Sequence, residues 1–252
     1  MDILKVDPDY QPRPDLLKGK TVMVTGAGDG IGRAAAMTYA TAGASVILVG
    51  RTSSKLEALY DEIERAGGAK PAIAEIDFAA ADENSYSTLA DNLGTDFTHL
   101  DGLLHNAGLL GEMRSIESTS YRAWQEVMQV NVNAQFLLTR ALMPLLQQAP
   151  SASIIFTSSS VGRAGRAYWG AYAVSKFATE GFMQVLAGEL ENTTKVRVNS
   201  LNPRATNTNM RRAAYPAETP TDNPSPEDIM QPYLYLMGDD SLGVTGRMFD
   251  AR

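Results

Sequence analysis

The chain has 252 residues, of which 44% are hydrophobic and 20% charged, and this size and balance predict one globular α/β domain with a large core. A formal net charge of −7 argues against sequence-independent binding of nucleic acid, which needs concentrated basic charge. The absence of cysteine excludes disulfides, thiolate metal sites and a cysteine nucleophile, and the two histidines are too few to suggest a metal centre.

No apolar run reaches the roughly 18–20 residues that span a bilayer. The first ten residues are acidic and lack the apolar segment of a signal peptide. We therefore expect a cytoplasmic protein with no membrane association. Residues 1–19 carry Pro8, Pro12 and Pro14 and show no clear period, so they predict an extended arm that lies on the surface or across a partner subunit.

Residues 20–252 show a regular alternation of strand and helix patterns. Short apolar runs rich in β-branched residues predict strands at 21–25, 45–49, 71–76, 100–104, 153–157, 196–201 and 247–250. Alanine-rich or amphipathic segments predict helices at 31–42, 53–66, 82–93, 120–147, 169–190 and 226–238. Pro144 is expected to kink or stop its helix.

This alternation predicts a single-domain, doubly wound parallel sheet of about seven strands with helices on both faces, the Rossmann architecture. Ligands of such sheets bind beyond the carboxyl ends of the strands. One long proline-containing loop, at about 204–226, carries a single helical turn near Met210–Ala214 and is expected to be functional.

A glycine cluster lies where the first strand turns into the first helix, in the run Thr25-Gly-Ala-Gly-Asp-Gly-Ile-Gly32. Glycines let the backbone approach a phosphate closely, and the helix N-terminus offers free N–H groups. The common spacing G-x-G-x-x-G does not fit, and the run reads T-G-x-x-x-G-I-G. A plain tight turn is the alternative, but the position favours a dinucleotide loop.

The second strand ends at Val49-Gly50-Arg51, without the acidic residue that would accept hydrogen bonds from the ribose of NAD. A guanidinium there suits a 2′-phosphate, which favours NADP(H) over NAD(H). The alternative is that Arg51 merely ends a surface turn. Arg33 and Ser53 are further candidates for the phosphate site, unless they are simply solvated.

Tyr172 and Lys176 are four residues apart, so on a helix they share one face. An ammonium beside a phenol favours the phenolate and would lower the tyrosine pKa from about 10 toward the range of an acid/base catalyst. The pattern is weak by itself, because such pairs occur by chance on exposed helix faces.

Together these residues resemble the classical short-chain dehydrogenase/reductase family over residues 18–250. The matching motifs are Thr25–Gly32, Asn106-Ala-Gly108, Asn131 in Val130-Asn-Val-Asn133, Ser159, Tyr172-x-x-x-Lys176 and Asn202-Pro203. Within the family the chain is most similar to the YciK-like bacterial oxidoreductases.

The resemblance implies an NADP(H)-dependent oxidoreductase acting on a carbonyl or alcohol substrate. Tyr172 would be the general acid/base, and Lys176 would lower its pKa and hold the nicotinamide ribose. Ser159, selected from three consecutive serines by its spacing from the tyrosine, would orient the carbonyl. Asn131 would hold a water that links Lys176 to solvent.

The resemblance also implies the residues that bind the cofactor. They are Gly26, Gly28, Asp29, Gly30, Ile31, Arg51, Asp77, Phe78, Asn106, Ala107, Gly108, Tyr172, Lys176, Pro203, Thr206 and Thr208, and no metal ligand is expected.

Two positions depart from the family pattern. His105 stands where the family usually has asparagine, and we expect it to pack beneath the cofactor rather than to act as a base. Arg204 stands where the family usually has a glycine that permits a conformation arginine resists. We therefore expect the loop that carries Thr206 and Thr208 to be set differently.

The family binds its substrate with the loop at about 204–226 and with residues between the serine and the tyrosine. The candidates are Arg163, Arg166, Tyr168, Trp169, Arg211, Arg212 and Tyr215. The arginines would favour an anionic carbonyl compound, unless they form a solvated face. The family also implies a homodimer or homotetramer built on the long helices.

Two other functions stay open at this point. The chain could be a catalytically silent dinucleotide-binding sensor or scaffold subunit, although such a protein has no need of a proton donor beside the nicotinamide. An α/β protein that binds nucleic acid is disfavoured by the acidic charge.

Overall fold

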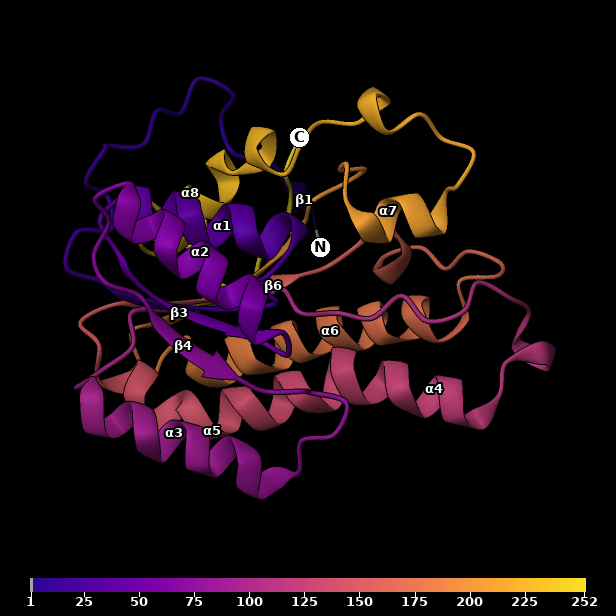
Figure 1. The fold of residues 1–252 in the computed structure, drawn as a ribbon, viewed down its shortest axis with the longest axis horizontal. Coiled ribbons are helices and arrows are strands. Elements are labelled where there is room, and N and C mark those ends of the chain that lie inside the picture. The colour runs from indigo at the N-terminus through magenta and orange to yellow at the C-terminus, as the bar shows by residue number, and fades with distance from the viewer. Residues whose placement is uncertain (1) are drawn as a thin grey trace.

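The computed structural model describes residues 2–252 and contains one parallel sheet with helices on both faces, as predicted (Figure 1). The sheet order is β1-β8-β7-β6-β5-β2-β3-β4. The strands are β1 (Ile3–Leu4), β2 (Thr21–Thr25), β3 (Ser45–Gly50), β4 (Ala72–Glu75), β5 (Gly102–His105), β6 (Ala152–Thr157), β7 (Val196–Asn202) and β8 (Met248–Asp250). The seven predicted strands are all present, with ends shifted by at most two residues.

The eighth strand comes from the N-terminal arm. Ile3 and Leu4 pair in parallel with Met248 and Phe249 and so add a short edge strand beyond β8. Further along the arm, Leu16 and Leu17 are buried in the core. The arm therefore lies against its own domain at both of these points.

The helices form two layers (Figure 1). Their bounds are α1 (Gly30–Thr41), α2 (Ser53–Arg65), α3 (Glu83–Asp96), α4 (Tyr121–Met128), α5 (Ala134–Gln148), α6 (Gly170–Leu190), α7 (Asn209–Ala214) and α8 (Gln231–Met237). One layer holds α1, α2 and α8, and the other holds α3, α4, α5 and α6. The short helix α7 lies in the loop after β7, at the place where one helical turn was predicted.

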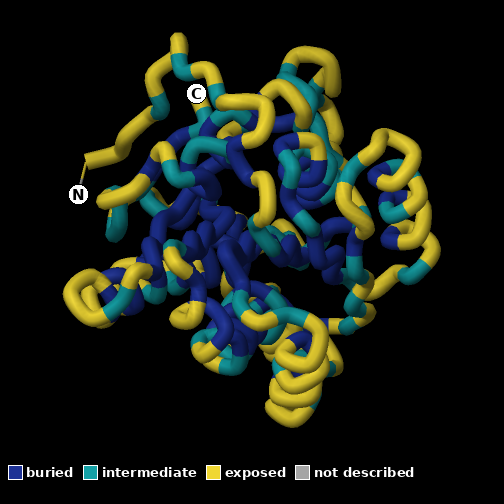
Figure 2. Tube along the Cα trace, turned by 90° about the vertical axis from the view of Figure 1, so that its left-hand side faces the viewer, coloured by how far each residue is buried: buried dark blue, intermediate teal, exposed yellow. Residues whose placement is uncertain are grey.

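Alternate residues of each strand point to opposite faces, so the sheet separates two apolar cores. In β2, Val22 and Val24 belong to the core under α1 and α8, whereas Met23 belongs to the core under α5 and α6. Figure 2 shows the buried strands as the centre of the molecule, with exposed segments around them. Because both faces are covered, the strands are apolar runs rather than alternating patterns.

The predicted helix over 120–147 is interrupted once in the structure. A π-helical turn at Gln129–Asn133 separates α4 from α5, and it contains Asn131. Pro144 does not stop the helix, which runs on to Gln148. Pro144 lies on the exposed side, where the Arg140 carbonyl that loses its partner can be hydrated, while Leu145 and Leu146 bury the last turn.

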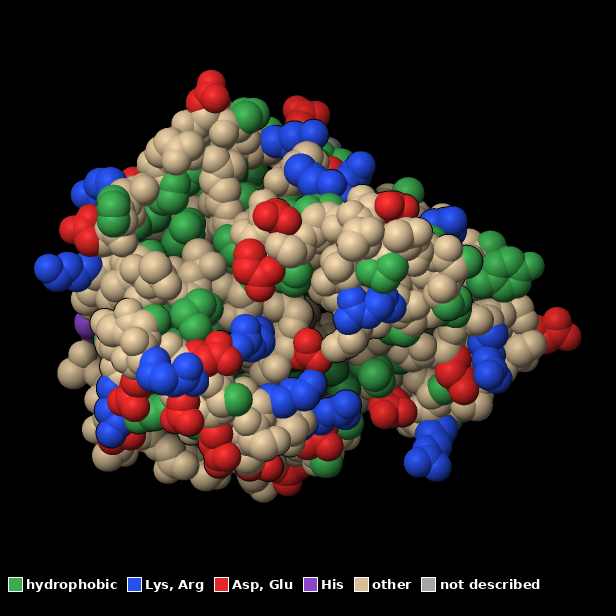
Figure 3. Space-filling model, turned by 45° about the horizontal axis from the view of Figure 1, so that its top comes forward, with side chains coloured by type: hydrophobic (Ala, Val, Ile, Leu, Met, Phe, Trp, Pro, Cys, Tyr) green, Lys and Arg blue, Asp and Glu red, His purple; other side chains and the backbone are tan. Residues whose placement is uncertain are grey.

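The surface carries mixed charge. On the face shown in Figure 3, lysine and arginine side chains are interspersed with aspartate and glutamate and form no continuous basic area. This distribution agrees with the net charge of −7 and offers no footprint for a nucleic-acid backbone on that face. In residues 2–252, no helix has the length and apolar character needed to cross a membrane.

Candidate active site

The glycine loop joins β2 to α1 and makes a turn that only glycine fits at its narrowest points. Gly26 and Gly30 have φ angles of +69° and +52°, in the left-handed region. A Cβ atom on Gly32 would overlap the carbonyl oxygen of Gly26. The first turn of α1 is therefore drawn close to the loop, which leaves its backbone N–H groups free to face an anion.

Thr25 fastens this loop to the segment after β5. Its hydroxyl donates to the Leu104 carbonyl (3.2 Å) and accepts from the backbone N–H groups of Asn106 (2.9 Å) and Ala107 (3.0 Å). The Asn106-Ala107-Gly108 segment is thus fixed beneath the glycine loop, at the carboxyl ends of two neighbouring strands.

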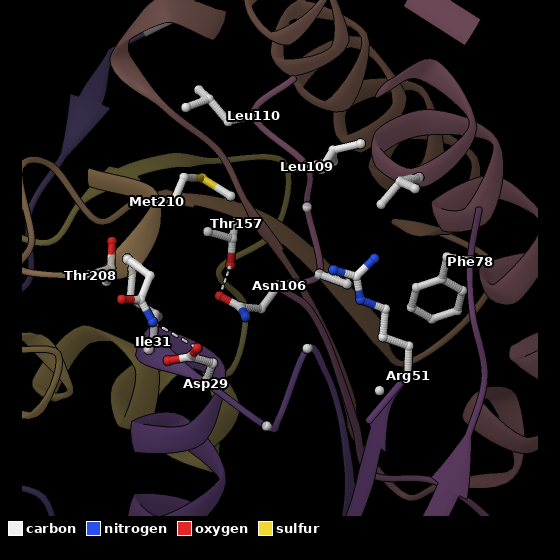
Figure 4. Close-up of a pocket in the computed structure, with 18 of the residues that line it drawn as sticks. Asp29, Ile31, Arg51, Phe78, Asn106, Leu109, Leu110, Thr157, Thr208 and Met210 are labelled. Atoms are coloured by element: carbon white, nitrogen blue, oxygen red, sulfur yellow. Dashed lines mark hydrogen bonds between the residues drawn. The ribbon is translucent and has the colours of Figure 1, made fainter. Parts of the chain in front are cut away.

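A cavity of about 600 Å³ runs along the carboxyl ends of the strands (Figure 4). Most of the residues expected to bind the cofactor line it, namely Gly26, Gly28, Asp29, Gly30, Ile31, Arg51, Asp77, Phe78, Asn106, Ala107, Gly108, Tyr172, Lys176, Pro203 and Thr208. Thr206 does not line it, because its side chain is buried and donates to the Pro203 carbonyl (3.1 Å). The volume lies in the range of small-molecule and cofactor sites.

Arg51 lies at one end of the cavity, near Phe78 (Figure 4). Within residues 2–252, no carboxylate forms a salt bridge with its guanidinium. Arg33 pairs with Glu62, and Ser53 donates to Glu75, so neither of these candidates for the phosphate site is free. Arg51 is the cation at this end that can receive a phosphate.

Asp29 links three segments around the cavity. Its carboxylate accepts from the Lys55 ammonium (2.9 Å) and from the Asn209 side-chain amide (2.9 Å). The hydrogen bond from Lys55 is the main reason that the pKa of Asp29 is lowered. The glycine loop is thereby tied to α2 and to α7, which carries Asn209.

Tyr172 and Lys176 lie on one face of α6, as their spacing predicted, and both are buried. The ammonium donates to the Thr157 carbonyl (2.8 Å) and lies 5.6 Å from the centre of the tyrosine ring. The Ser159 hydroxyl favours the ionised form of the phenol. Tyr172 and Lys176 line the cavity, whereas the Ser159 side chain does not contribute to its lining. Lys176 contacts Thr157 at the end of β6, and β5 and β2 separate that strand from β3, which Arg51 follows, so the pair lies toward the end of the cavity away from Arg51.

The pKa of Tyr172 is not lowered in this structure, contrary to the expectation from its spacing to Lys176. Burial raises the pKa of Tyr172 to about 12, against the smaller opposing effect of Ser159. Burial lowers the pKa of Lys176 to about 8, and the nearby Glu180 carboxylate opposes that change. Tyr172 is therefore a neutral phenol at pH 7, which is the form that can donate a proton.

Asn131 is buried and does not line the cavity. Its side chain accepts from the Leu109 N–H (2.7 Å) and donates to the Leu109 carbonyl (2.9 Å) and to the Ser175 hydroxyl (2.9 Å). These bonds fix the segment after β5 against α6. The Asn131 side chain thus holds Leu109, which lines the cavity, beside the helix that carries Tyr172.

Ser158, which precedes Ser159, and Arg163, a candidate substrate ligand, belong to a buried network. Glu180 accepts from the Ser158 hydroxyl (2.6 Å) and from Arg163 (2.7 Å). Arg163 also pairs with Asp250 on β8 (2.8 Å). The network joins the segment after β6 to α6 and β8, and Arg163 has no part in the cavity lining.

Arg204 adopts the conformation that a glycine would take, with a φ angle of +63°. Its N–H donates to the Asn202 side chain (3.0 Å), and its guanidinium lies 3.3 Å from Asp250. Arginine therefore takes the left-handed conformation at this position, and these contacts hold it there.

His105 is buried beneath the cavity, as expected. It bonds to the Thr139 hydroxyl through Nε2 (2.8 Å) and stacks on Phe156. Burial, with a smaller effect of Lys176, lowers the pKa of His105 to about 3. The imidazole is neutral at pH 7 and serves packing rather than proton transfer.

Several lining residues were missed in the sequence, among them Lys55, Leu109, Leu110 and Met210. Leu109 and Leu110 directly follow Asn106-Ala-Gly108 at the end of a predicted strand, which is a signal that could have identified them. Lys55 gave no signal, because a lysine in the first turn of an amphipathic helix is ordinary. No group of three His, Cys, Asp or Glu side chains that could hold a metal ion occurs among the described residues.

Known proteins are similar to this chain over most of its length. The family model for short chain dehydrogenases matches residues 20–219. YciK of Escherichia coli K12, an uncharacterized oxidoreductase, is 51% identical over 96% of this chain and 96% of its own.

Two solved structures are similar over nearly the whole chain. A short chain dehydrogenase of Pseudomonas syringae is 54% identical, with a TM-score of 0.93 over 97% of this chain and 99% of that one. A short chain dehydrogenase of E. coli CFT073, complexed with NADPH, is 51% identical, with a TM-score of 0.93 over 96% of this chain and 100% of that one.

Proposed function

The chain belongs to the short-chain dehydrogenase family, and from that premise we propose that it is an NADP(H)-dependent oxidoreductase that interconverts a carbonyl compound and its alcohol. One observation carries the proposal. A single cavity has the glycine loop and Arg51, which no carboxylate of residues 2–252 pairs with, toward one end, and buried Tyr172 and Lys176 toward the other. The solved E. coli relative that is complexed with NADPH supports the choice of cofactor.

The residues present fit a dinucleotide. The glycine loop and the N-terminus of α1 would hold the pyrophosphate, and the Arg51 guanidinium would bind the 2′-phosphate by charge-assisted hydrogen bonds. Asp77 and Phe78 would lie beside the adenine, and Asn106 to Gly108 beneath the adenosine ribose. Lys176, Pro203 and Thr208 would contact the nicotinamide half. When bound, the reduced cofactor supplies the hydride.

The protein's own groups handle the proton. Tyr172, neutral because burial raises its pKa, donates its proton to the carbonyl oxygen as negative charge develops there. Ser159 hydrogen-bonds to the same oxygen and to the phenol. The Lys176 ammonium stabilises the tyrosinate that remains. In the oxidative direction the same phenol must first lose its proton, so alcohol oxidation requires a higher pH than carbonyl reduction.

The test is turnover by variants of Tyr172. We expect Tyr172→Phe to reduce kcat for NADPH-dependent carbonyl reduction by about 10²–10⁴-fold, the usual contribution of a general acid, while the affinity for NADPH in fluorescence titration changes little. Tyr121→Phe is the matched control, because that phenol is 74% exposed and lies outside the cavity.

This experiment also decides between the proposal and its main alternative. A catalytically silent sensor or scaffold subunit would bind NADPH but would show no turnover on any carbonyl compound, in the wild type as in the variant. Binding of neither NADPH nor NADH would contradict both functions. Salt-sensitive binding to DNA or RNA would instead support the third function, that of an α/β protein that binds nucleic acid.

We also propose that the protein works as a homo-oligomer, built first as a dimer through α6. Val174, Phe177 and Val185 form a stripe on this helix and are 42, 46 and 61% exposed. Gly181 lies within the stripe and leaves open space beside the backbone. A second copy of the same helix can cover these side chains.

A cysteine-free sequence suits the cytoplasm, which is the localisation we propose.

A further inference from the structure

The cavity wall near Tyr172 is apolar. Leu109 and Leu110 from the segment after β5, Met210 from α7 and Pro203 line the cavity together with Tyr172, and Figure 4 shows Leu109, Leu110 and Met210 at the end of the cavity away from Asp29 and Ile31. Behind Tyr172, a cluster of Val161, Trp169 and Ala173 is packed against Leu110, Met210 and Tyr215. Apolar side chains therefore form much of the wall beside Tyr172, where the reacting carbonyl must lie.

Three of the arginines near this end are paired with carboxylates. Arg163 is held by Glu180 and Asp250, and Arg204 by Asp250. Arg211 forms two hydrogen bonds of 2.6 Å with Glu218. Each of these guanidiniums already has a carboxylate partner.

The two remaining arginines are also engaged. Arg166 donates to the Tyr215 hydroxyl (2.6 Å) and lies over the Trp169 and Tyr215 rings. Arg212 donates to the side chains of Asn207 and Asn209. None of these five arginines lines the cavity. The sequence-based suggestion of an anionic substrate therefore has no support in the structure.

The charged residues that do line the cavity are not placed to bind an anionic substrate either. Arg51 lies at the far end, Lys55 pairs with Asp29, and Lys176 donates to the Thr157 carbonyl at the reacting end. Glu126, on α4, lines the cavity and repels a carboxylate.

The uncharged polar groups at this end already have partners. The Thr208 hydroxyl accepts from the Arg211 N–H, and the Asn209 side chain bonds to Asp29 and Arg212. Ser159 and Tyr172 together serve one oxygen atom, that of the reacting carbonyl. Apart from the O–H of Thr208, which only accepts in its bond with Arg211, these groups offer no free partner to a second hydroxyl on the substrate. Such a hydroxyl would lose its water for little gain, and a carboxylate would lose more.

We infer, on the basis of the proposed function, that the substrate is an uncharged carbonyl compound whose remaining surface is apolar, such as a hydrophobic ketone, and that Met210 together with Leu109 and Leu110 determines this preference. A polyol-derived ketone or a keto acid is excluded from good binding by the same wall.

The test compares three ketones of one shape, namely 4-methylcyclohexanone, 4-hydroxycyclohexanone and 4-oxocyclohexanecarboxylate. Each is titrated into the wild-type protein saturated with NADP⁺, where no turnover can occur, and binding is measured by calorimetry. We expect the methyl ketone to bind most tightly, the hydroxyl ketone about tenfold more weakly, and the carboxylate about 100-fold more weakly. Equal or tighter binding of the hydroxyl ketone or the carboxylate, or binding of none of the three, overturns the inference.

A charge placed in the wall should reverse the order. Met210→Lys is expected to tighten binding of the carboxylate at least tenfold and to weaken binding of the methyl ketone, with the affinity for NADP⁺ unchanged within about twofold. Met210→Leu is the matched control and should keep the wild-type order. An unchanged order in Met210→Lys that still binds NADP⁺ contradicts the role given to this wall.

The outcomes distinguish a failure of this inference from a failure of the proposed function. Binding in the expected order without NADPH-dependent turnover of any carbonyl compound supports the inference and counts against catalysis. Preferential turnover of the carboxylate supports catalysis and counts against the inference.

Discussion

Tyr172 and Lys176 lie four residues apart on the buried side of α6, and burial shifts their pKa values in opposite directions. Burial disfavours the charged form of both groups, so it raises the pKa of the phenol to about 12 and lowers that of the ammonium to about 8. The sequence predicted that the two side chains share a face but not which effect would dominate, because spacing contains no information on desolvation. A neutral phenol beside an ammonium that is close to losing its proton is suited to carbonyl reduction at neutral pH.

The pH dependence of reduction follows from Lys176. As pH rises through about 8, Lys176 loses its proton and can no longer stabilise the tyrosinate, while Tyr172 stays protonated. We expect kcat/KM for NADPH, which reports groups of the free enzyme, to be level near pH 7 and to fall above about 8. Glu180→Gln should move the fall to lower pH, because the Glu180 carboxylate raises the pKa of Lys176. A profile that stays level well above pH 9 would show that the charge of Lys176 is not required.

Arg51 is the residue that should select the phosphorylated cofactor. Its loss removes charge-assisted hydrogen bonds to the 2′-phosphate, so Arg51→Ala is expected to raise KM for NADPH about 10–100-fold and KM for NADH much less. Arg33→Ala is the matched control, because Arg33 is already paired with Glu62. Equal effects of Arg51→Ala on the two cofactors would remove the basis for preferring NADP(H).

At the scale of elements, the regular strands and helices could be predicted and the irregular ones could not. Apolar runs and amphipathic periods identified the seven strands β2 to β8 and the main helices, because both patterns are properties of the local sequence. The π-helical turn at Gln129–Asn133 has no local signal. The strand at Ile3–Leu4 has only two residues, and it depends on pairing with Met248–Phe249 at the other end of the chain.

The loop after β7 shows how tertiary contacts overrule a local preference. Arginine resists a φ of +63°, yet Arg204 is held there by Asn202 and Asp250. Asp250 is held in turn by Arg163, which lies far away in the sequence. The sequence predicted the conflict correctly, but its resolution required knowing that β8 places Asp250 beside Asn202.

Substitution of Arg204 should therefore have an unusual order of effects. Both alanine and glycine lose the contact with Asp250. Alanine keeps the cost of about 1–2 kcal/mol of the left-handed conformation, whereas glycine adopts that conformation without this cost. We expect Arg204→Gly to be more stable than Arg204→Ala by about 1 kcal/mol in urea unfolding. The opposite order would show that residue 204 does not hold a left-handed conformation.

At the scale of the whole molecule, α6 carries Tyr172 and Lys176 on its buried side and the apolar stripe on its exposed side. Because Val174, Phe177 and Val185 are accessible on the single chain, we expect a dimer in solution. Phe177→Glu would bury a charge against the partner helix and should yield monomers in light scattering, while Phe177→Leu should leave the dimer intact. A wild-type protein that is monomeric at micromolar concentration would contradict this arrangement.

The most direct measurement of the central claim follows the hydride itself. The protein is incubated with a carbonyl substrate and with NADPH that carries deuterium on one face of nicotinamide C4, and the product alcohol is analysed by mass spectrometry. We expect one deuterium in the alcohol from one labelled face and none from the other, and no labelled alcohol with Tyr172→Phe in the same time. Tight binding of NADPH by the wild-type protein with no transfer of deuterium from either face, to any carbonyl compound tested, would contradict the claim that this site is an oxidoreductase active site.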